Sequence, residues 1–127
     1  MRIENRALAF ATHFFRKRGC TVEDVSHDRG VLGCDLVVTC RGKRSKIEVK
    51  GCSREWQIPD LHSTEFDERR RLVADFLCVV YYIGKAPPVL CLIPRRAIKP
   101  EHLTKLTRYR IKSGVKKEAV LGRFVQR

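Results

Sequence analysis

A chain of 127 residues with 43% hydrophobic content is long enough for one packed core and too short for two ordinary domains, so we expect a single domain over residues 1–127. The 27 basic and 14 acidic residues give a formal charge of +13, which exceeds what solubility needs and favours a polyanionic partner over a merely solvated basic surface. No stretch approaches the roughly 20 apolar residues of a membrane-spanning helix, so a membrane partner is not expected.

Hydrophobic periodicity and turn residues predict helices and strands in alternation. The N-terminal segment carries apolar side chains at helical spacing and ends at Gly19, which is typical of an amphipathic helix. The turn-forming run Arg41–Arg44 separates two β-branched segments and indicates a β-hairpin. The expected elements are a helix over 3–18, a strand over 20–25, a loop over 26–33, hairpin strands over 35–40 and 46–49, a helix capped at Ser63 or Thr64 and running to Asp75, strands over 76–83 and 89–93, and a helix over 101–107. This order predicts an α/β sandwich with a mixed central sheet flanked by helices, followed by a basic segment at about 105–127.

Six cysteines stand at positions 20, 34, 40, 52, 78 and 91. None belongs to a Cys-x-x-Cys pair, and most fall within apolar runs that resemble strands. We therefore expect reduced core thiols in a cytoplasmic protein. A zinc site made from these thiols and the four histidines would lack the usual paired spacing of ligands and is not expected.

Three charged residues are expected to share one face of the hairpin. If the turn closes with an even number of residues, Asp35 lies opposite Lys50, and Glu48 stands two residues before Lys50 on the same strand. Opposed residues, and residues two apart on a strand, share a face. Gly42 would occupy the first position of a two-residue turn, where positive φ is common. An odd turn would put Asp35 on the other face.

Two carboxylates and an ammonium on an apolar sheet are costly unless they are paired or bind something. Mg²⁺ suits these oxygen ligands, keeps several waters and can bridge to a phosphate, and Mn²⁺ would substitute for it. The bound cation would polarise a phosphodiester and help to form hydroxide. Lys50 would orient or deprotonate the water, or stabilise charge on the phosphate. The alternative is a surface ion pair between Glu48 and Lys50, with Asp35 capping a turn.

Asp35 followed by Glu48-Val49-Lys50 resembles the pattern of the PD-(D/E)XK nuclease superfamily, and the resemblance covers roughly residues 3 to 93. It implies a restriction-endonuclease-like fold, a catalytic Lys50 and a Mg²⁺ site made by Asp35, Glu48 and the backbone carbonyl of Val49. It also implies that Glu4, on the first helix, reaches the metal through water, although a favourable charge at a helix N-terminus is the alternative for this residue. Cys34 stands where the family has a proline.

Within the superfamily, the chain is similar to archaeal Holliday junction resolvases, whose loop serine Ser26 would match, and equally to Mrr-like and restriction-type domains. The expected activity is that of a Mg²⁺-dependent DNA endonuclease that hydrolyses phosphodiester bonds, with structure-specific junction cleavage as one form of it. Symmetric cutting would favour a homodimer. The alternative from another class is a non-catalytic nucleic-acid-binding protein that retains the nuclease fold.

Basic residues gather in the second predicted helix and in the C-terminal segment. The segment from Lys105 onward holds eight basic residues and one acidic residue, with Tyr109 and Phe124 interleaved for packing or base stacking. No helix-turn-helix or zinc-finger signature is present, which favours recognition of DNA shape. The expected DNA contacts are Ser26, Arg69, Arg70, Arg71, Lys105, Arg108, Arg110, Lys112, Lys116 and Lys117.

Overall fold

The computed structural model describes residues 3–28, 33–53, 66, 71–82, 87–98, 103–105, 109–111 and 122–125. Its elements in chain order are α1 (Ile3–Lys17), β1 (Thr21–Asp24), η1 (Ser26–Asp28), β2 (Leu36–Cys40), β3 (Lys43–Cys52), β4 (Phe76–Tyr81), β5 (Val89–Pro94), η3 (Arg95–Ala97), β6 (Leu103–Lys105), β7 (Tyr109–Ile111) and β8 (Gly122–Val125). The first helix and the five strands expected up to residue 93 are therefore confirmed, with small shifts at their ends.

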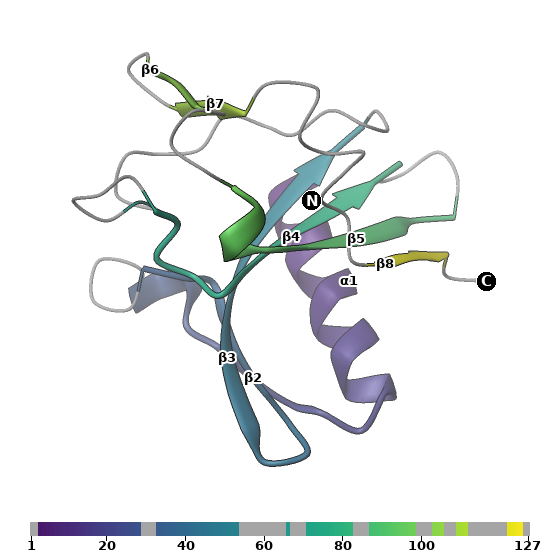
Figure 1. The fold of residues 1–127 in the computed structure, drawn as a ribbon. Helices are drawn as coiled ribbons and strands as arrows, with labels where there is room; N and C mark the ends of the chain where they lie inside the picture. Colours follow the sequence, from purple (N-terminus) through teal and green to yellow (C-terminus); the bar gives the residue numbers. More distant parts are fainter. Residues whose placement is uncertain are drawn as a thin grey trace.

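The main sheet has the strand order β1-β2-β3-β4-β5-β8 (Figure 1). Its pairs are antiparallel except for β3 with β4, which run parallel. Strands β6 and β7 form a separate antiparallel pair. The predicted α/β class with a mixed sheet is confirmed, while the restriction-endonuclease-like form of it stays a prediction.

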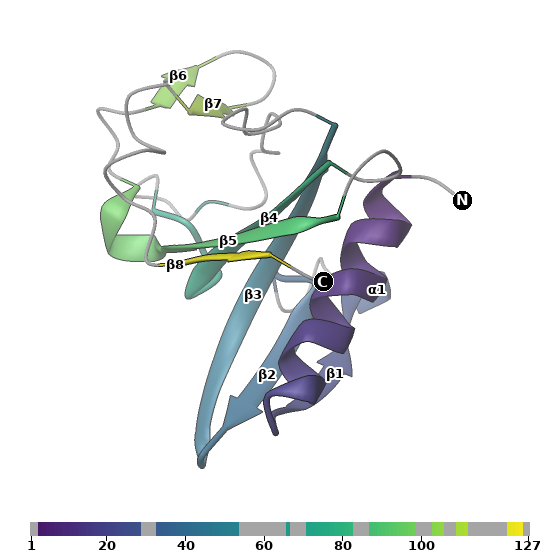
Figure 2. The same ribbon diagram turned by 90° about the vertical axis from the view of Figure 1, so that its right-hand side faces the viewer.

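Helix α1 covers one face of the sheet (Figure 2). Its buried side chains are Ala7, Ala11, Phe14 and Phe15, and its basic last turn complements the helix dipole. This apolar stripe packs on alternate residues of the central strands, including Ile47 and Val49 of β3. A second core lies on the opposite face of the sheet. No helix in the described ranges is long and apolar enough to cross a membrane.

The hairpin of β2 and β3 turns at Arg41 and Gly42, whose φ angles of 51° and 78° are both positive. Two positive φ angles in a two-residue loop are the mark of a type I′ turn. The predicted register, with Asp35 opposite Lys50, is therefore wrong by two residues, because Gly42 takes the second turn position and not the first. A shift of two keeps every side chain on its predicted face. The pairing of the two strands begins at Leu36 and Ile47, directly after Asp35.

Two predicted helices are wrong where the structure describes them. Phe66 and Leu72 form an isolated antiparallel β-bridge, and the chain from 71 to 75 is not helical. Asp75 hydrogen-bonds to Lys46 through both its backbone N–H and its side chain, so the residue directly before β4 is fixed to β3. The helix expected over 101–107 is also wrong, because Leu103–Lys105 pairs with β7. The remaining residues of both predicted helices lie outside the described residues.

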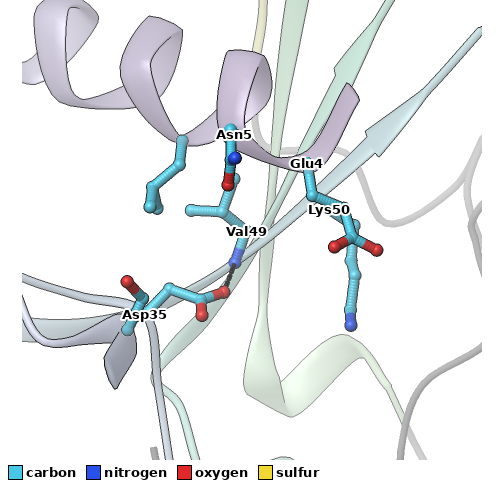
Figure 3. Close-up of a pocket in the computed structure, with 7 residues that line it drawn as sticks. Glu4, Asn5, Asp35, Val49 and Lys50 are labelled. Carbon is cyan, nitrogen blue, oxygen red and sulfur yellow. Dashed lines mark hydrogen bonds between the residues drawn. The ribbon is translucent and has the colours of Figure 1, made fainter. Parts of the chain in front are cut away.

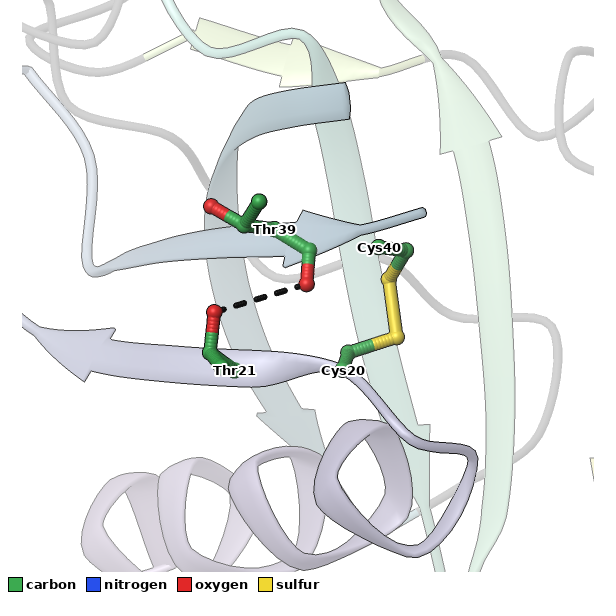
Figure 4. The surroundings of a disulfide bond; sticks show 4 residues. All are labelled: Cys20, Thr21, Thr39 and Cys40. Carbon is green, nitrogen blue, oxygen red and sulfur yellow. Dashed lines mark hydrogen bonds between the residues drawn. A yellow bond between two sulfur atoms is a disulfide. The ribbon is translucent and has the colours of Figure 1, made fainter. Parts of the chain in front are cut away.

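Cys20 and Cys40 form a disulfide (Figure 4), so the expectation that all six cysteines are reduced is wrong. Thr21 pairs with Thr39 in the β1–β2 ladder, and the Thr21 hydroxyl donates to the Thr39 carbonyl at 3.5 Å. The next residue pair outward is therefore Cys20 and Cys40, whose Cα atoms are 4.5 Å apart, within the range that a disulfide needs. The other four cysteines are free and buried, as expected for core thiols.

Reduction of this disulfide should lower the free energy of unfolding by about 3 kcal/mol, because the crosslink closes a loop between residues 20 apart in the unfolded chain. Urea unfolding with and without a reducing agent measures the difference. A Cys20→Ser/Cys40→Ser variant is the control and should be insensitive to the reductant. A wild-type unfolding midpoint that stays the same after mass spectrometry has confirmed reduction would contradict the prediction.

Candidate active site

Asp35 is held rigidly at the start of β2. Its backbone N–H donates to the Ile47 carbonyl at 3.0 Å, and its carbonyl accepts from Val25 N–H at 2.9 Å. Its side-chain Oδ2 accepts from the backbone N–H of Val49 at 2.9 Å. The backbone pairing of β2 with β3 begins at Leu36 and Ile47, and the carboxylate of Asp35 bonds to β3 two residues further along, at Val49. Asp35 is only 6% exposed, so its charge is largely removed from solvent.

The residues before Asp35 account for its placement. Gly33 has a φ of 66°, and a Cβ at this position would lie 2.7 Å from Cγ1 of Val73. Only glycine fits both the backbone conformation and this close approach. Cys34 is fully buried, and this burial raises the pKa of its thiol. Cys34 therefore stays a neutral thiol at neutral pH beside the carboxylate.

Glu48 and Lys50 lie on the face of β3 that is turned away from α1. Because Ile47 and Val49 pack against α1, the alternating residues Glu48 and Lys50 point to the opposite face. Glu48 is fully buried, and its Oε2 lies 3.7 Å from Nζ of Lys50, whose side chain is 17% exposed. Its other oxygen, Oε1, is buried and accepts no hydrogen bond from the described residues. The buried carboxylate of Glu48 is thus paired with an ammonium that is itself partly exposed to solvent.

A cavity of about 160 Å³ opens at this point. Figure 3 shows Asp35 on one side of Val49, with Glu4 and Lys50 on the other. The lining residues come from α1, η1, the start of β2 and β3, and they are Glu4, Asn5, Leu8, Ser26, Asp35, Val49 and Lys50. Five residues predicted for the site thus line one cavity. Glu48, also predicted for the site, does not line this cavity but contacts Lys50, which does.

Glu4 reaches the cavity because α1 lies unusually close to β3. A Cβ on Gly51 would be 3.0 Å from the Ala7 Cβ and 3.0 Å from the Ile3 carbonyl oxygen. The absence of a side chain at Gly51 therefore lets the first turn of α1 rest on the strand directly after Lys50. Glu4 is exposed as a residue, yet its side chain faces the cavity.

Substitution of Gly51 should displace the first turn of α1 in proportion to the size of the new side chain. Gly51→Ala needs shifts of a few tenths of an ångström, whereas Gly51→Val should cost about 1–3 kcal/mol of unfolding free energy through overpacking. Urea unfolding of the two variants tests this order. Equal stability of Gly51→Val and wild type would show that the helix does not depend on this contact.

Ser26 is fixed by Asp24, whose Oδ1 accepts from the Ser26 backbone N–H at 2.9 Å and from its hydroxyl at 2.6 Å. Of the other predicted DNA contacts, Arg71 is exposed. Lys105 lies in β6 and Arg110 in β7. The remaining predicted contacts lie outside the described residues, and they are Arg69, Arg70, Arg108, Lys112, Lys116 and Lys117.

Asn5 and Leu8 line the cavity although neither was predicted to do so. Both belong to the first two turns of α1, beside Glu4 or one helical turn after it. Helical spacing puts Leu8 on the same stripe of α1 as Glu4, so the expectation that Glu4 reaches the metal points to Leu8 as well. Asn5 carried no such signal, because it follows Glu4 directly and falls outside that stripe.

The donor set suits an oxygen-loving cation bound by few protein ligands. Within the described part of the chain, no three His, Cys, Asp or Glu side chains gather closely enough to hold a metal ion by themselves. Mg²⁺ does not require such a group, because it is commonly held by one or two carboxylates together with water and substrate phosphate. Asp35 and Glu48 provide two carboxylates on adjoining strands, both buried. The residues present therefore fit Mg²⁺ better than zinc.

Comparison with protein-family models, with curated proteins and with solved structures gives no match for this chain. What the protein does must therefore be inferred from its own residues. These are the buried carboxylate of Asp35 and the partly exposed ammonium of Lys50 at the wall of a polar cavity, and the buried carboxylate of Glu48 next to Lys50, in a chain with a formal charge of +13.

Proposed function

We propose that this protein is a divalent-cation-dependent DNA endonuclease of the PD-(D/E)XK type, which hydrolyses phosphodiester bonds at the cavity lined by Asp35 and Lys50. The observation that carries the proposal is the carboxylate of Asp35, which accepts from the Val49 N–H and lines one cavity with Lys50, the partner of the fully buried Glu48. The superfamily pattern assigns metal binding to the same two acidic residues and catalysis to the same lysine.

Burial of these charged groups is costly for folding. Removing a charge from water costs several kcal/mol, and a buried ion pair recovers this only with excellent geometry. Glu48 stands opposite Leu77 and Lys50 opposite Val79 in the ladder, and both neighbours are buried and apolar. The nearest atoms of the Glu48–Lys50 pair are 3.7 Å apart, longer than a strong hydrogen bond. A role in binding and catalysis explains why these charges occupy a position that apolar residues would fill more favourably.

Asp35, Glu48 and the backbone carbonyl of Val49 would hold Mg²⁺, or Mn²⁺ in its place. When bound, the cation would supply polarisation of the scissile phosphate and a more acidic water. Lys50 would orient or deprotonate the attacking water, or donate to the phosphate as negative charge develops. Glu4, which lies on the same side of Val49 as Lys50, would accept a hydrogen bond from water in the cavity.

The charge of the chain supports DNA as the substrate, since lysine and arginine side chains that neutralise phosphates supply most of the non-specific affinity for it. Cleavage of branched DNA and a homodimeric state belong to the same proposal, as does a cytoplasmic location, for which the four buried cysteines outside the disulfide are the remaining support. Symmetric cutting of a duplex or junction would require two cavities related by a twofold axis.

The test is incubation of the purified protein with plasmid, linear duplex, single-stranded and four-way-junction DNA, in Mg²⁺ and in EDTA. Mg²⁺-dependent cleavage of at least one substrate is the expected result. Binding of these DNAs without cleavage in Mg²⁺ or Mn²⁺ would favour a non-catalytic binding protein instead. The spread of activity over the four substrates would show whether branched DNA is preferred.

A further inference from the structure

Strand β3 lies between β2 and β4, and its first residues extend past the end of β4, which leaves an open corner in the sheet. It pairs with β4 only from Ile47 onward, whereas the four residues before it pair with β2 alone. Figure 1 shows the β2–β3 hairpin projecting beyond β4 and β5. Asp75 closes the inner end of the corner: its N–H donates to the Lys46 carbonyl, and its Oδ2 accepts from the Lys46 N–H, both at 2.8 Å.

Basic side chains line this corner, which contains a cavity of about 240 Å³. Lys43 and Arg44 come from the start of β3, and Arg95 and Arg96 come from η3, directly after β5. All four are exposed. Asp75 is the only acidic residue among the described residues that line the cavity. We call these four residues the basic corner.

Asp75 organises the basic corner without neutralising it. Its Oδ1 lies 3.8 Å from Nη2 of Arg95, and its carbonyl accepts from the Arg95 N–H at 2.8 Å. One acidic group therefore faces four cations. Like charges gathered around one concave surface raise the local potential and attract an anion. The cavity also includes Ser45, whose hydroxyl is a donor suited to a phosphate oxygen.

We infer that the basic corner binds the phosphate backbone of duplex DNA at a distance from the cavity of Asp35. This inference rests on the proposed function, because it takes the scissile phosphate to lie at the cavity of Asp35. Arg44 lies four residues before Glu48, on the same face of β3, which is about 13 Å along the strand. A duplex aligned with β3 rises about 3.4 Å for each base pair, so the contact falls about four base pairs from the scissile phosphate. The substrate is then a duplex arm that extends at least that far on one side.

The test compares two variants that each lower the formal charge from +13 to +11. Arg44→Gln/Arg96→Gln alters the basic corner but keeps Arg95, which Asp75 holds. Arg16→Gln/Lys17→Gln is the matched control in the last turn of α1, where both side chains are exposed and neither lines the corner. Fluorescence anisotropy of a labelled duplex, without divalent metal and over a range of salt, gives the affinity of each protein. Circular dichroism confirms that each is folded.

The basic-corner variant should show a slope of log K against log salt that is shallower by about 1.8, since each phosphate contact contributes about 0.9. If the two proteins have equal affinity at 1 M salt, this difference in slope makes the basic-corner variant bind about 60-fold more weakly than wild type at 0.1 M salt. The control variant should keep most of the wild-type slope. An unchanged slope for the basic-corner variant, or an equal loss in the control, would overturn the inference.

Cleavage, measured separately, distinguishes this inference from the proposed function. If wild type cuts DNA and the basic-corner variant keeps its salt slope, the corner is rejected and the endonuclease stands. If the slope falls only in the basic-corner variant but wild type never cuts, the corner stands as a DNA-binding surface and the endonuclease is rejected.

Discussion

Replacement of Glu48 by glutamine is expected to abolish Mg²⁺-dependent DNA cleavage and to leave metal-free DNA binding intact. Glutamine keeps the size of the side chain but removes one of the two buried carboxylates that would hold the cation. Because phosphate polarisation and water activation both require the ion, cleavage should fail completely. The basic surfaces are unchanged, and one negative charge near the DNA is lost, so affinity without metal should stay equal or rise slightly. Cleavage and anisotropy measured on one preparation give both results.

Thermal or urea unfolding gives a readout of the same variant that does not depend on activity. Without metal, Glu48→Gln should be less stable than wild type, because the change removes one partner of the buried Glu48–Lys50 pair and leaves the ammonium of Lys50 without the negative charge of Glu48. Mg²⁺ at about 100 times its dissociation constant should stabilise wild type by about 2.7 kcal/mol and should not stabilise the variant. Glu23→Gln, the same change at an exposed position of β1, is the control and should respond to Mg²⁺ like wild type. A folded Glu48→Gln protein that still cuts DNA would reject the proposed site.

Lys50→Met should reduce the single-turnover rate of cleavage by about 10²-fold or more, the usual cost of losing a group that transfers a proton or stabilises charge in the transition state. Methionine preserves most of the apolar stem of the lysine. Metal binding should persist, because an ammonium is not a metal ligand and its loss removes a cation 3.7 Å from Glu48.

Lys46→Met provides the matched control for this variant. Lys46 lies on the same strand and the same face, four residues before Lys50, and it does not line the cavity. With enzyme in excess over DNA, Lys46→Met should cut at close to the wild-type rate. If Lys50→Met also cut at that rate, Lys50 would have no part in catalysis and the assignment to the superfamily would lose its main support.

The central part of the site was predictable because it depends on parity and not on exact register. An even turn puts Asp35 on the face of Glu48 and Lys50 whether the loop is Gly42-Lys43 or Arg41-Gly42, so the error of two residues did not separate them. Helix α1 was predictable for a similar reason: its apolar stripe is long and regular, and Gly19 ends it.

Features that depend on tertiary pairing were not predictable. The residues before β4 have acidic-then-basic order typical of a helix, yet Asp75 is bound to Lys46, far away in sequence, and this contact overrides the local preference. The disulfide requires the β1–β2 register, which places Cys20 opposite Cys40 and leaves no sign in their spacing. The need for glycine at position 51 likewise follows from the packing of α1 against β3, which the sequence does not show.

The most direct measurement of the central claim is a Mn²⁺ titration in the presence of duplex DNA, followed by electron paramagnetic resonance. Lys50→Met is the suitable background, because it should keep the carboxylates and leave the DNA uncut during the experiment. We expect saturable binding of Mn²⁺ to this protein, and binding at least about tenfold weaker when Glu48→Gln is added, a loss of about 1.4 kcal/mol or more. Equal Mn²⁺ affinity in the two proteins, both shown to be folded and bound to DNA, would contradict the assignment of Asp35 and Glu48 as the cation site.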